Sequence, residues 1–338
     1  MGNKLSVTEA ALLGTSGLMG ALAIHYRNES LAQKRRKNEL AWTLLNQSPL
    51  AKSEKRQASS EYGRNFKPRP SDVFIVTYPK CGTTWMSQIC HVLRGGDMSF
   101  SEITEVCPWD ENAKMCGQDL DADQVRSPRI FKSHLRREEI AKGGKYIYVV
   151  RHPEDVFVSY FHFTSGFRGL KPGDFTMHQF EEEVMGGQRG PIWDHYMGWH
   201  AVREDPAVLW VFFEDLKEDF RGQVERVADF MEIPGDVREE RVGVALQKAS
   251  FEFMSKHKNQ FDDNFLRRHM NPKKESPEEK VNKEKGGKVG KVRKGKTGQG
   301  SQIPRDIRER LQEQWRQRIG AKTDCMDYDS LRKSFRSK

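Results

Sequence analysis

One short segment, residues 77–85, constrains the fold of this chain more than any other, and it reads TYPKCGTTW. It follows residues 72–76, an apolar and β-branched run that is typical of a buried strand. It leads into residues 86–93, whose apolar positions recur at helical spacing. A strand, a tight turn and a helix start in this order predict an anion-binding site, because unpaired backbone N–H groups and the positive end of the helix dipole point at the turn.

The side chains of this turn also suit an anionic ligand. Lys80 adds a positive charge, and Thr83 and Thr84 add hydroxyl donors. Trp85 offers a flat face on which a base can stack. The turn is not a Walker loop, because its lysine precedes the single glycine, Gly82, whereas the Walker pattern places the lysine after a glycine. An ordinary strand–helix turn is the alternative, but folding alone explains this concentration of lysine, glycine and threonine poorly.

The rest of the chain alternates strand and helix signals. Residues 129–134 are typical of a strand that ends on polar side chains, and residues 145–150 and 207–213 are short apolar runs that predict buried strands. Each of the last two is followed by a helical pattern, and the helix after residue 213 is expected to run through Phe230. This alternation predicts an α/β fold with a central parallel sheet flanked by helices. Ligands of such sheets bind beyond the carboxyl ends of the strands, so we expect the turn after residue 76, residues 132–134 and Arg151 to converge.

We expect two regions in the chain. Residues 1–65 have the composition of an appendage, with an apolar stretch, a charged helical segment and a polar linker over residues 48–60. Residues 66–335 form the α/β domain, which includes a helix near its end, over residues 305–319. Within the domain, residues 272–300 are rich in Lys, Gly and Glu and poor in apolar residues, which predicts a mobile lid.

Composition excludes several classes of protein. The chain has 338 residues, 36% of them hydrophobic and 31% charged, and a net charge of +9 that suits an anionic ligand. It has no zinc-finger, RNP-like or helix-turn-helix pattern, so we expect no nucleic-acid partner. Five cysteines without a CxxC pair favour a reducing compartment, here the cytoplasm, over a disulfide framework. The ten histidines show no metal-ligand spacing, so no metal is implied.

The N-terminal segment is open to three interpretations. It begins MGNKLS, which fits the N-myristoylation pattern, and an apolar run over residues 10–24 precedes the basic cluster at residues 34–37. The apolar run is too short to span a bilayer easily. The segment is an acylated anchor for peripheral membrane association, a targeting peptide, or a helix that packs on the domain.

The segment at residues 77–85 resembles the 5′-phosphosulfate loop of the cytosolic-type sulfotransferases, which use 3′-phosphoadenosine 5′-phosphosulfate (PAPS). The resemblance covers about residues 66–298 and implies the sulfotransferase fold, which is related to that of P-loop NTPases. Cys81 stands where the family usually has serine, although the backbone N–H groups of the loop remain. The residues that the resemblance assigns to the donor in this loop are Lys80, Cys81, Gly82, Thr83, Thr84 and Trp85.

Arg151 and Ser159 resemble part of the family's 3′-phosphate site. Arg151 follows a strand, and with a helix starting near Pro153 the serine lies about two turns into that helix. An arginine can grip a phosphate by a two-pronged contact, and the serine adds a further donor. The alternative is that Arg151 pairs with a carboxylate such as that of Asp155.

Lys132 and His134 resemble the family's lysine-x-histidine pair, in which the histidine is the catalytic base. Transfer of a sulfuryl group to a hydroxyl requires removal of the acceptor proton as the bond forms, and a neutral imidazole suits that role near pH 7. The leaving 5′-phosphate gains negative charge, which Lys80 and Lys132 can offset. The resemblance thus implies three catalytic residues, His134, Lys80 and Lys132.

Three further segments resemble nucleotide-binding elements of the family, in the expected order. They are FFED at residues 212–215, ASFEFM at residues 249–254, and RKGKTG at residues 293–298, the second 3′-phosphate clamp. The contacts that they imply are Phe213, Ala249, Ser250, Phe251, Arg293, Lys294 and Gly295, with Trp85, Phe213 and Phe251 framing the adenine. After residue 298 the chain departs from the family's dimer segment, so the sequence leaves the oligomeric state open.

The sequence therefore predicts an enzyme that moves a sulfuryl group from PAPS to a hydroxyl or amine of a small molecule. Transfer is expected to be direct and in line, with no metal and no covalent enzyme intermediate. One alternative is a nucleotide or small-molecule kinase, which would need a Walker lysine and a magnesium-binding acid that the sequence does not show. The other is a non-catalytic PAPS-binding scaffold, which rests on the changes at Cys81, Phe213 and Ala249.

Overall fold

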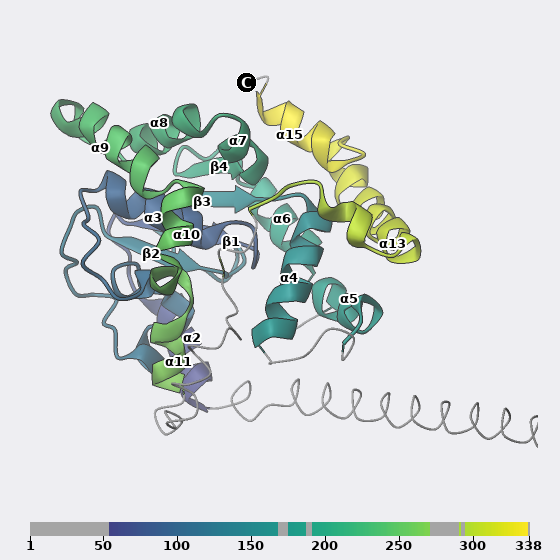
Figure 1. The fold of residues 1–338 in the computed structure, drawn as a ribbon, viewed down its shortest axis with the longest axis horizontal. Helices are drawn as coiled ribbons and strands as arrows, with labels where there is room; N and C mark the ends of the chain where they lie inside the picture. The colour runs from purple at the N-terminus through teal and green to yellow at the C-terminus, as the bar shows by residue number, and fades with distance from the viewer. Residues whose placement is uncertain (1–53, 168–174, 187–190, 271–290, 292–294, 337–338) are drawn as a thin grey trace, which may run out of the picture. The chain divides into compact units, whose positions relative to one another are not determined.

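The computed structural model describes residues 54–167, 175–186, 191–270, 291 and 295–336. Four parallel strands form its sheet (Figure 1), in the order β2-β1-β3-β4. The strands are β1 (Val73–Thr77), β2 (Ile130–Ser133), β3 (Lys145–Val150) and β4 (Val208–Phe212). The predicted α/β fold with a central parallel sheet is confirmed.

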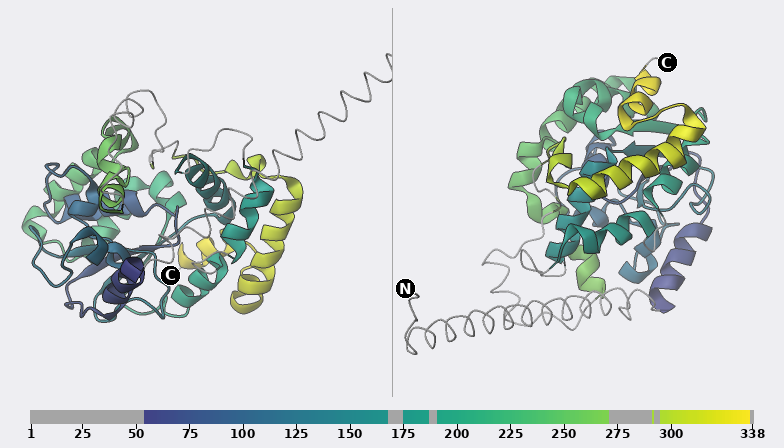
Figure 2. Two further views of the ribbon diagram at one scale, coloured as in Figure 1. Left: turned by 90° about the horizontal axis from the view of Figure 1, so that it is seen from below. Right: turned by 90° about the vertical axis from the view of Figure 1, so that its right-hand side faces the viewer.

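Helices cover both faces of the sheet (Figure 1 and Figure 2). The α-helices are α2 (Glu54–Asn65), α3 (Thr83–Leu93), α4 (Pro153–Phe167), α5 (Met177–Gly186), α6 (Ile192–His200), α7 (Phe213–Glu218), α8 (Phe220–Phe230), α9 (Gly235–Lys248), α10 (Phe251–Lys256), α11 (Asn264–Met270), α13 (Arg305–Trp315), α14 (Ala321–Thr323) and α15 (Tyr328–Arg336). The short 3₁₀ turns are η1 (Ile103–Glu105), η2 (Asp110–Asn112), η3 (Lys114–Cys116), η4 (Lys258–Phe261) and η5 (Gln299–Gln302), and a π-helical turn, η6 (Arg316–Gly320), follows α13. Within the described ranges, none of these helices has the length and apolar character needed to cross a bilayer.

Alternating side chains give the sheet an aliphatic face and an aromatic face. Ile75 and Ile147, from β1 and β3, belong to an aliphatic cluster that includes residues of α3, α8 and α9. On the other face, Tyr148 of β3 stacks on Trp199 of α6 with ring centres 5.1 Å apart. Each face of the sheet therefore packs against a different set of helices, and the sheet lies between the two sets.

All four strands run in one direction, so their carboxyl ends lie at one edge of the sheet. The turn after β1, His134 after β2 and Arg151 after β3 all start from this edge. Register fixes their relative depth, since Val73 lies opposite Ile130 of β2 and Lys145 of β3. The topology therefore brings three sequence-distant polar segments together.

The N-terminal boundary of the domain differs from the expected one. Much of the predicted polar linker is instead helical in α2, which packs against η2. The buried hydroxyl of Ser59 accepts a hydrogen bond from the backbone N–H of Met115, and a Cβ on Gly63 would lie 2.4 Å from the carbonyl oxygen of Asp110. The buried face of α2 consists of small residues rather than apolar ones, so hydrophobic periodicity did not reveal it. The domain includes α2 and does not begin at residue 66.

The prediction of one helix from the end of β4 through Phe230 is wrong, because the segment forms two helices, α7 and α8. They are separated at Asp219, whose carboxylate accepts a hydrogen bond from the backbone N–H of Gly222 at 3.0 Å. This is an N-cap, and it starts α8 as a separate helix.

The prediction of a mobile lid over residues 272–300 is wrong for the last residues of that range. Asp155 of α4 accepts hydrogen bonds from the backbone N–H groups of Gly298 and Gln299, at 3.0 and 2.6 Å. These contacts hold the start of η5 against α4, so this part of the segment is anchored. The rest of the expected lid, apart from Lys291 and residues 295–297, lies outside the described residues, as does the N-terminal segment 1–53.

Candidate active site

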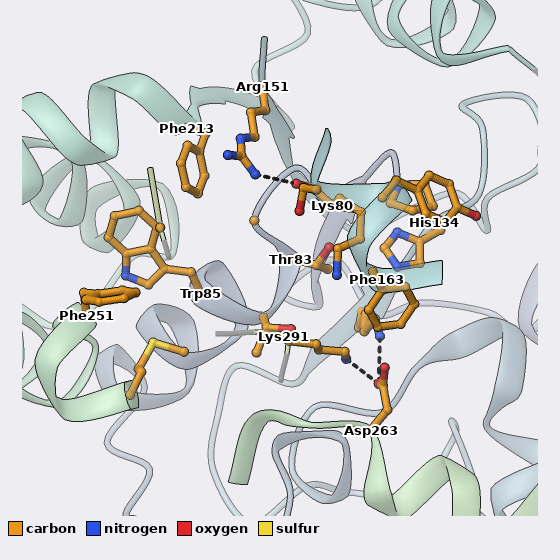
Figure 3. Close-up of a pocket in the computed structure, with 18 of the residues that line it drawn as sticks. Lys80, Thr83, Trp85, His134, Arg151, Phe163, Phe213, Phe251, Asp263 and Lys291 are labelled. Atoms are coloured by element: carbon orange, nitrogen blue, oxygen red, sulfur yellow. Dashed lines mark hydrogen bonds and ion pairs between the residues drawn. The ribbon is translucent and has the colours of Figure 1, made fainter. Parts of the chain in front are cut away.

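A cavity lies at the carboxyl edge of the sheet (Figure 3). Its wall comes from the turn after β1, the start of α3, the ends of β2 and β3, and parts of α4, α7 and α10. The predicted site residues that line it are Lys80, Gly82, Thr83, Thr84, Trp85, Lys132, His134, Arg151, Ser159, Phe213, Phe251 and Gly295. The cavity thus brings together most of the residues that the sequence predicted for the site.

The turn after β1 exposes backbone groups to the cavity. Lys80 and Gly82 have positive φ angles, 75° and 111°, which turn the chain sharply before α3 begins at Thr83. A Cβ on Gly82 would lie 2.9 Å from the ring of Phe213, so a larger residue would displace that ring. The hydroxyl of Thr83 lies 2.6 Å from that of Thr77, which ties the first turn of the helix to β1. The N-terminal turn of α3 can therefore bind a phosphate through its N–H groups.

Lys80 and Lys132 each rest on an aromatic ring. The Lys80 ammonium lies 3.8 Å from the ring centre of Phe163, and that of Lys132 lies 3.5 Å from the ring centre of Trp109. Burial, and then the nearby charge of Lys291, lower the pKa of Lys80 to about 7 and that of Lys132 to about 8. An anionic ligand would stabilise the charged form of both lysines.

His134 is oriented through one ring nitrogen. Its Nδ1 lies 2.8 Å from the carbonyl oxygen of Thr77, and a carbonyl can only accept, so Nδ1 carries the proton in the neutral ring. The lone pair of the neutral ring is therefore on Nε2. Glu111 supports this arrangement, because one of its oxygens accepts hydrogen bonds from the His134 backbone N–H and from the Trp109 indole, both at 2.8 Å. This tautomer suits a general base that acts through Nε2.

Arg151 extends across the turn after β1. Its guanidinium donates to the carbonyl oxygens of Lys80 and Lys296, at 3.2 and 2.8 Å, and lies 4.4 Å from the ring centre of Phe213. The expected alternative partner, Asp155, is 3.9 Å away, and its oxygens accept the backbone hydrogen bonds of η5 described above. Within the described residues the buried Nε of Arg151 has no hydrogen-bond partner. A donor is therefore left for an anionic ligand.

Aromatic rings form the opposite end of the cavity. The indole of Trp85 donates to the carbonyl oxygen of Ala249 at 2.7 Å, and its ring centre lies 5.5 Å from that of Phe213. Phe251 is 43% exposed, and a Cβ on Gly295 would lie 2.9 Å from its ring. These three rings border a partly open end of the cavity (Figure 3), which suits a planar base.

Some predicted residues do not line the cavity. The thiol of Cys81 is buried 3.8 Å from the hydroxyl of Tyr196, and burial raises its pKa to about 12. Ala249 is buried behind Trp85, and Ser250 is the N-cap of α10, where its hydroxyl accepts from the backbone N–H of Phe253. Arg293 and Lys294 lie outside the described residues.

Sequence reasoning missed other residues of the wall. They are Pro79, Trp109, Tyr160, Phe163, Lys217, Met254, Asp263, Lys291 and Gln299. Lys291 was hidden in a basic, glycine-rich stretch, and Asp263 lies in no segment for which a pattern was recognised. No group of His, Cys, Asp and Glu side chains that could hold a metal occurs in the part of the chain that the structure describes.

Comparisons with known proteins identify the family of this chain. The family model for the sulfotransferase domain matches residues 70–333. The chain is 33% identical over 202 residues to amine sulfotransferase of Oryctolagus cuniculus, which covers 56% of this chain and 65% of the relative. It is 32% identical over 275 residues to sulfotransferase 1E1 of Mus musculus, which covers 77% of this chain and 86% of the relative. The match to sulfotransferase 2B1 of Mus musculus is 38% identical over 178 residues, which covers 49% of this chain and 51% of the relative.

Two solved structures share the fold. Retinol dehydratase in complex with androsterone and inactive cofactor PAP has a TM-score of 0.60 at 20% identity, over 80% of this chain and 86% of that chain. Mouse sulfotransferase SULT7A1 complexed with PAP has a TM-score of 0.57 at 23% identity, over 81% of this chain and 93% of that chain. Because the family model spans the whole sheet and the lining of the cavity, the chain belongs to the sulfotransferase family.

Proposed function

We propose that this protein transfers a sulfuryl group from PAPS to a hydroxyl or amine of a small molecule. The observation that carries this proposal is the convergence of Lys80, Lys132 and His134 beside the N-terminus of α3 in one cavity. Two buried cations and a correctly oriented imidazole at a phosphate-binding turn are the groups that such a transfer requires. Nothing in the family match favours the kinase alternative.

The cavity fits the donor in its chemistry. The turn after β1 and the buried Nε of Arg151 supply hydrogen-bond donors for phosphate groups, and Ser159 adds a hydroxyl at the same wall. The rings of Trp85, Phe213 and Phe251 suit the adenine. The donor would therefore lie with its adenine at the aromatic end and its sulfuryl group toward Lys132 and His134.

The proposed chemistry is a single displacement. As the acceptor oxygen forms a bond to sulfur, Nε2 of His134 accepts the acceptor proton, and the bond from sulfur to the 5′-phosphate oxygen breaks. Lys80 and Lys132 stabilise the negative charge that develops on that leaving oxygen. The role of Thr77 is to hold Nδ1 protonated, so that the basic nitrogen is Nε2.

The wall around His134 suggests the class of acceptor. Trp109, Tyr160 and Phe163 line the cavity on this side, and the Trp109 ring lies edge-on to His134 with centres 5.1 Å apart. An apolar or aromatic small molecule with one hydroxyl or amine fits such a surface. We place the reaction in the cytoplasm, which agrees with the five free and buried cysteines.

Nucleotide selectivity tests this proposal. The product nucleotide, 3′-phosphoadenosine 5′-phosphate (PAP), is expected to bind at least about tenfold tighter than adenosine 5′-phosphate, because charge-assisted hydrogen bonds to the 3′-phosphate contribute about 1.5–3 kcal/mol each. Isothermal titration calorimetry of the two nucleotides at one salt concentration gives both dissociation constants. Equal affinities for the two nucleotides would contradict the proposed 3′-phosphate site, and therefore the proposal that PAPS is the donor.

A further inference from the structure

A third lysine lines the cavity, and the reaction scheme above gives it no role. Lys291 is separated by 159 positions in the numbering from Lys132, yet both ammonium groups contact the same carboxylate, that of Asp263 (Figure 3). The Lys132 ammonium lies 3.8 Å from Asp263 Oδ1, and Lys291 makes a shorter ion pair with the same oxygen. The three side chains are 6% to 10% exposed, so solvent screens this group of charges only weakly.

In the part of the chain that the structure describes, four cations of this group, Lys80, Lys132, Lys291 and Arg151, interact electrostatically. Two carboxylates lie within ion-pair distance of them: Asp263 contacts Lys132 and Lys291, and Asp155 lies 3.9 Å from Arg151. Although burial opposes it, the charge of Asp263 raises the pKa of Lys291 above its usual value. The same carboxylate raises the pKa of Lys80 and Lys132 against the larger, opposite effect of burial. Asp263 thus keeps three buried amines closer to their charged state.

Asp263 is itself fixed by the fold. It precedes α11 and has a positive φ of 64°, and its side chain is 7% exposed. It lies on the same side of the cavity as His134 and Phe163, away from Trp85 and Phe251 (Figure 3), and this is the side proposed for the reacting end of the donor. The Asp263 carboxylate therefore lies between the ammonium groups of Lys132 and Lys291, where an anionic group of the donor could also bind.

We propose that Lys291 binds the sulfuryl group of the donor, and that Asp263 is a positioning residue that holds Lys291 and Lys132 in place until the donor arrives. The proposal rests on the proposed function, since it assumes PAPS as the donor. In it, the anionic oxygens of the sulfuryl group take over the contacts that Asp263 makes to the two lysines. Lys291 becomes a third cation at the reacting end of the cavity, beside Lys80 and Lys132.

The first test measures binding without turnover. Lys291→Met keeps the apolar stem and removes the charge, and its affinities for PAPS and for PAP are measured by calorimetry without an acceptor. We expect PAPS to bind about tenfold more weakly, as for the loss of one charge-assisted contact, and PAP to bind within about threefold of wild type. Unchanged affinity for PAPS, or an equal loss for both nucleotides, would overturn the assignment to the sulfuryl group.

An ion pair on the preceding helix, α10, controls for the loss of a lysine. Lys256 and Glu252 form this pair 2.7 Å apart on the exposed surface, so Lys256→Met removes a lysine from an ion pair outside the cavity. It should change neither affinity. Wild-type protein that binds neither nucleotide would contradict the proposed function, whereas wild-type binding with an unaffected Lys291→Met variant would contradict only this inference.

The second test uses Asp263→Asn and a pH series. Without the carboxylate, the pKa values of Lys80, Lys132 and Lys291 should all be lower than in wild type. As pH rises, PAPS binding by the variant should therefore begin to weaken at a lower pH than binding by the wild type. The other charged or titratable groups that face this cluster are Lys80, Glu102, Glu111, His134 and Arg151, and the variant leaves all of them in place. Glu252→Gln is the matched control and should keep the wild-type profile. A profile for Asp263→Asn that coincides with wild type, in protein whose thermal midpoint shows it to be folded, would rule out the positioning role.

Discussion

His134→Ala is expected to lower kcat by about a hundredfold or more with an aliphatic alcohol as acceptor, while the affinity for PAP stays nearly unchanged. The variant removes the Nε2 lone pair that accepts the proton, but it leaves the groups proposed to bind the nucleotide. Steady-state kinetics with PAPS, together with calorimetry of PAP, separates these two effects. With an acidic phenol that is already ionised as the acceptor, the substitution should lower kcat less, because this acceptor has no proton to transfer.

Another buried histidine supplies the control. His91 on α3 contacts the carbonyl oxygen of Asp97 at 2.7 Å and packs edge-on against Phe100, away from the cavity. His91→Ala should lower the thermal midpoint and leave kcat near the wild-type value. If His134→Ala turns over the alcohol at nearly the wild-type rate, His134 is not the base and the mechanism is wrong.

Lys80→Met is expected to lower kcat/KM for PAPS by about a hundredfold, because it removes a preorganised cation from the leaving oxygen. It should also change the pH dependence of PAP binding. In wild type the pKa of Lys80 is lowered to about 7, so the side chain becomes neutral as pH rises above 7, and an anionic ligand must restore its proton. The affinity of the wild type for PAP should therefore fall as pH rises from 7 to 8.5, and PAP binding should be accompanied by proton uptake by the protein. The phosphate groups do not add to this change, because their second pKa is about 6.

The variant should lose the part of this dependence that Lys80 contributes, and keep the part due to Lys132, whose pKa is lowered to about 8. Calorimetry in two buffers of different ionisation enthalpy measures the proton uptake directly. Lys256→Met serves again as the control and should behave as wild type. Proton uptake that is the same in Lys80→Met and wild type would show that Lys80 is not the titrating group.

The sequence was sufficient for the sheet and for the turn at its edge. The strand over residues 145–150 was predicted with its observed bounds, and the other three differ from the observed ones by one residue at each shifted end. Buried parallel strands are short apolar runs, so their pattern is nearly independent of their neighbours. The same topology rule predicted the convergence of Lys80, His134 and Arg151, which the cavity contains.

The sequence was insufficient where a contact joins segments without a shared pattern. The pair of Asp263 and Lys291 exists only because the chain returns to the cavity after 27 intervening positions, and neither residue type is distinctive alone. The buried thiol of Cys81 contacts the hydroxyl of Tyr196, which is 115 positions away in the sequence, so its orientation depends on a distant residue. The burial of α2 depends on small residues that accept a close backbone approach, such as Gly63. Such features follow from tertiary packing rather than from local propensity.

The most direct test of the central claim follows the sulfur atom. Wild-type protein is incubated with ³⁵S-labelled PAPS and a panel of phenols, alcohols and amines, and with γ-³²P-labelled ATP in parallel. We expect ³⁵S to move to an acceptor with one PAP formed for each product. No ³⁵S should stay covalently bound to the protein, and no ³²P should be transferred. Transfer of ³²P from ATP, or tight PAPS binding without transfer to any member of the panel, would contradict the claim.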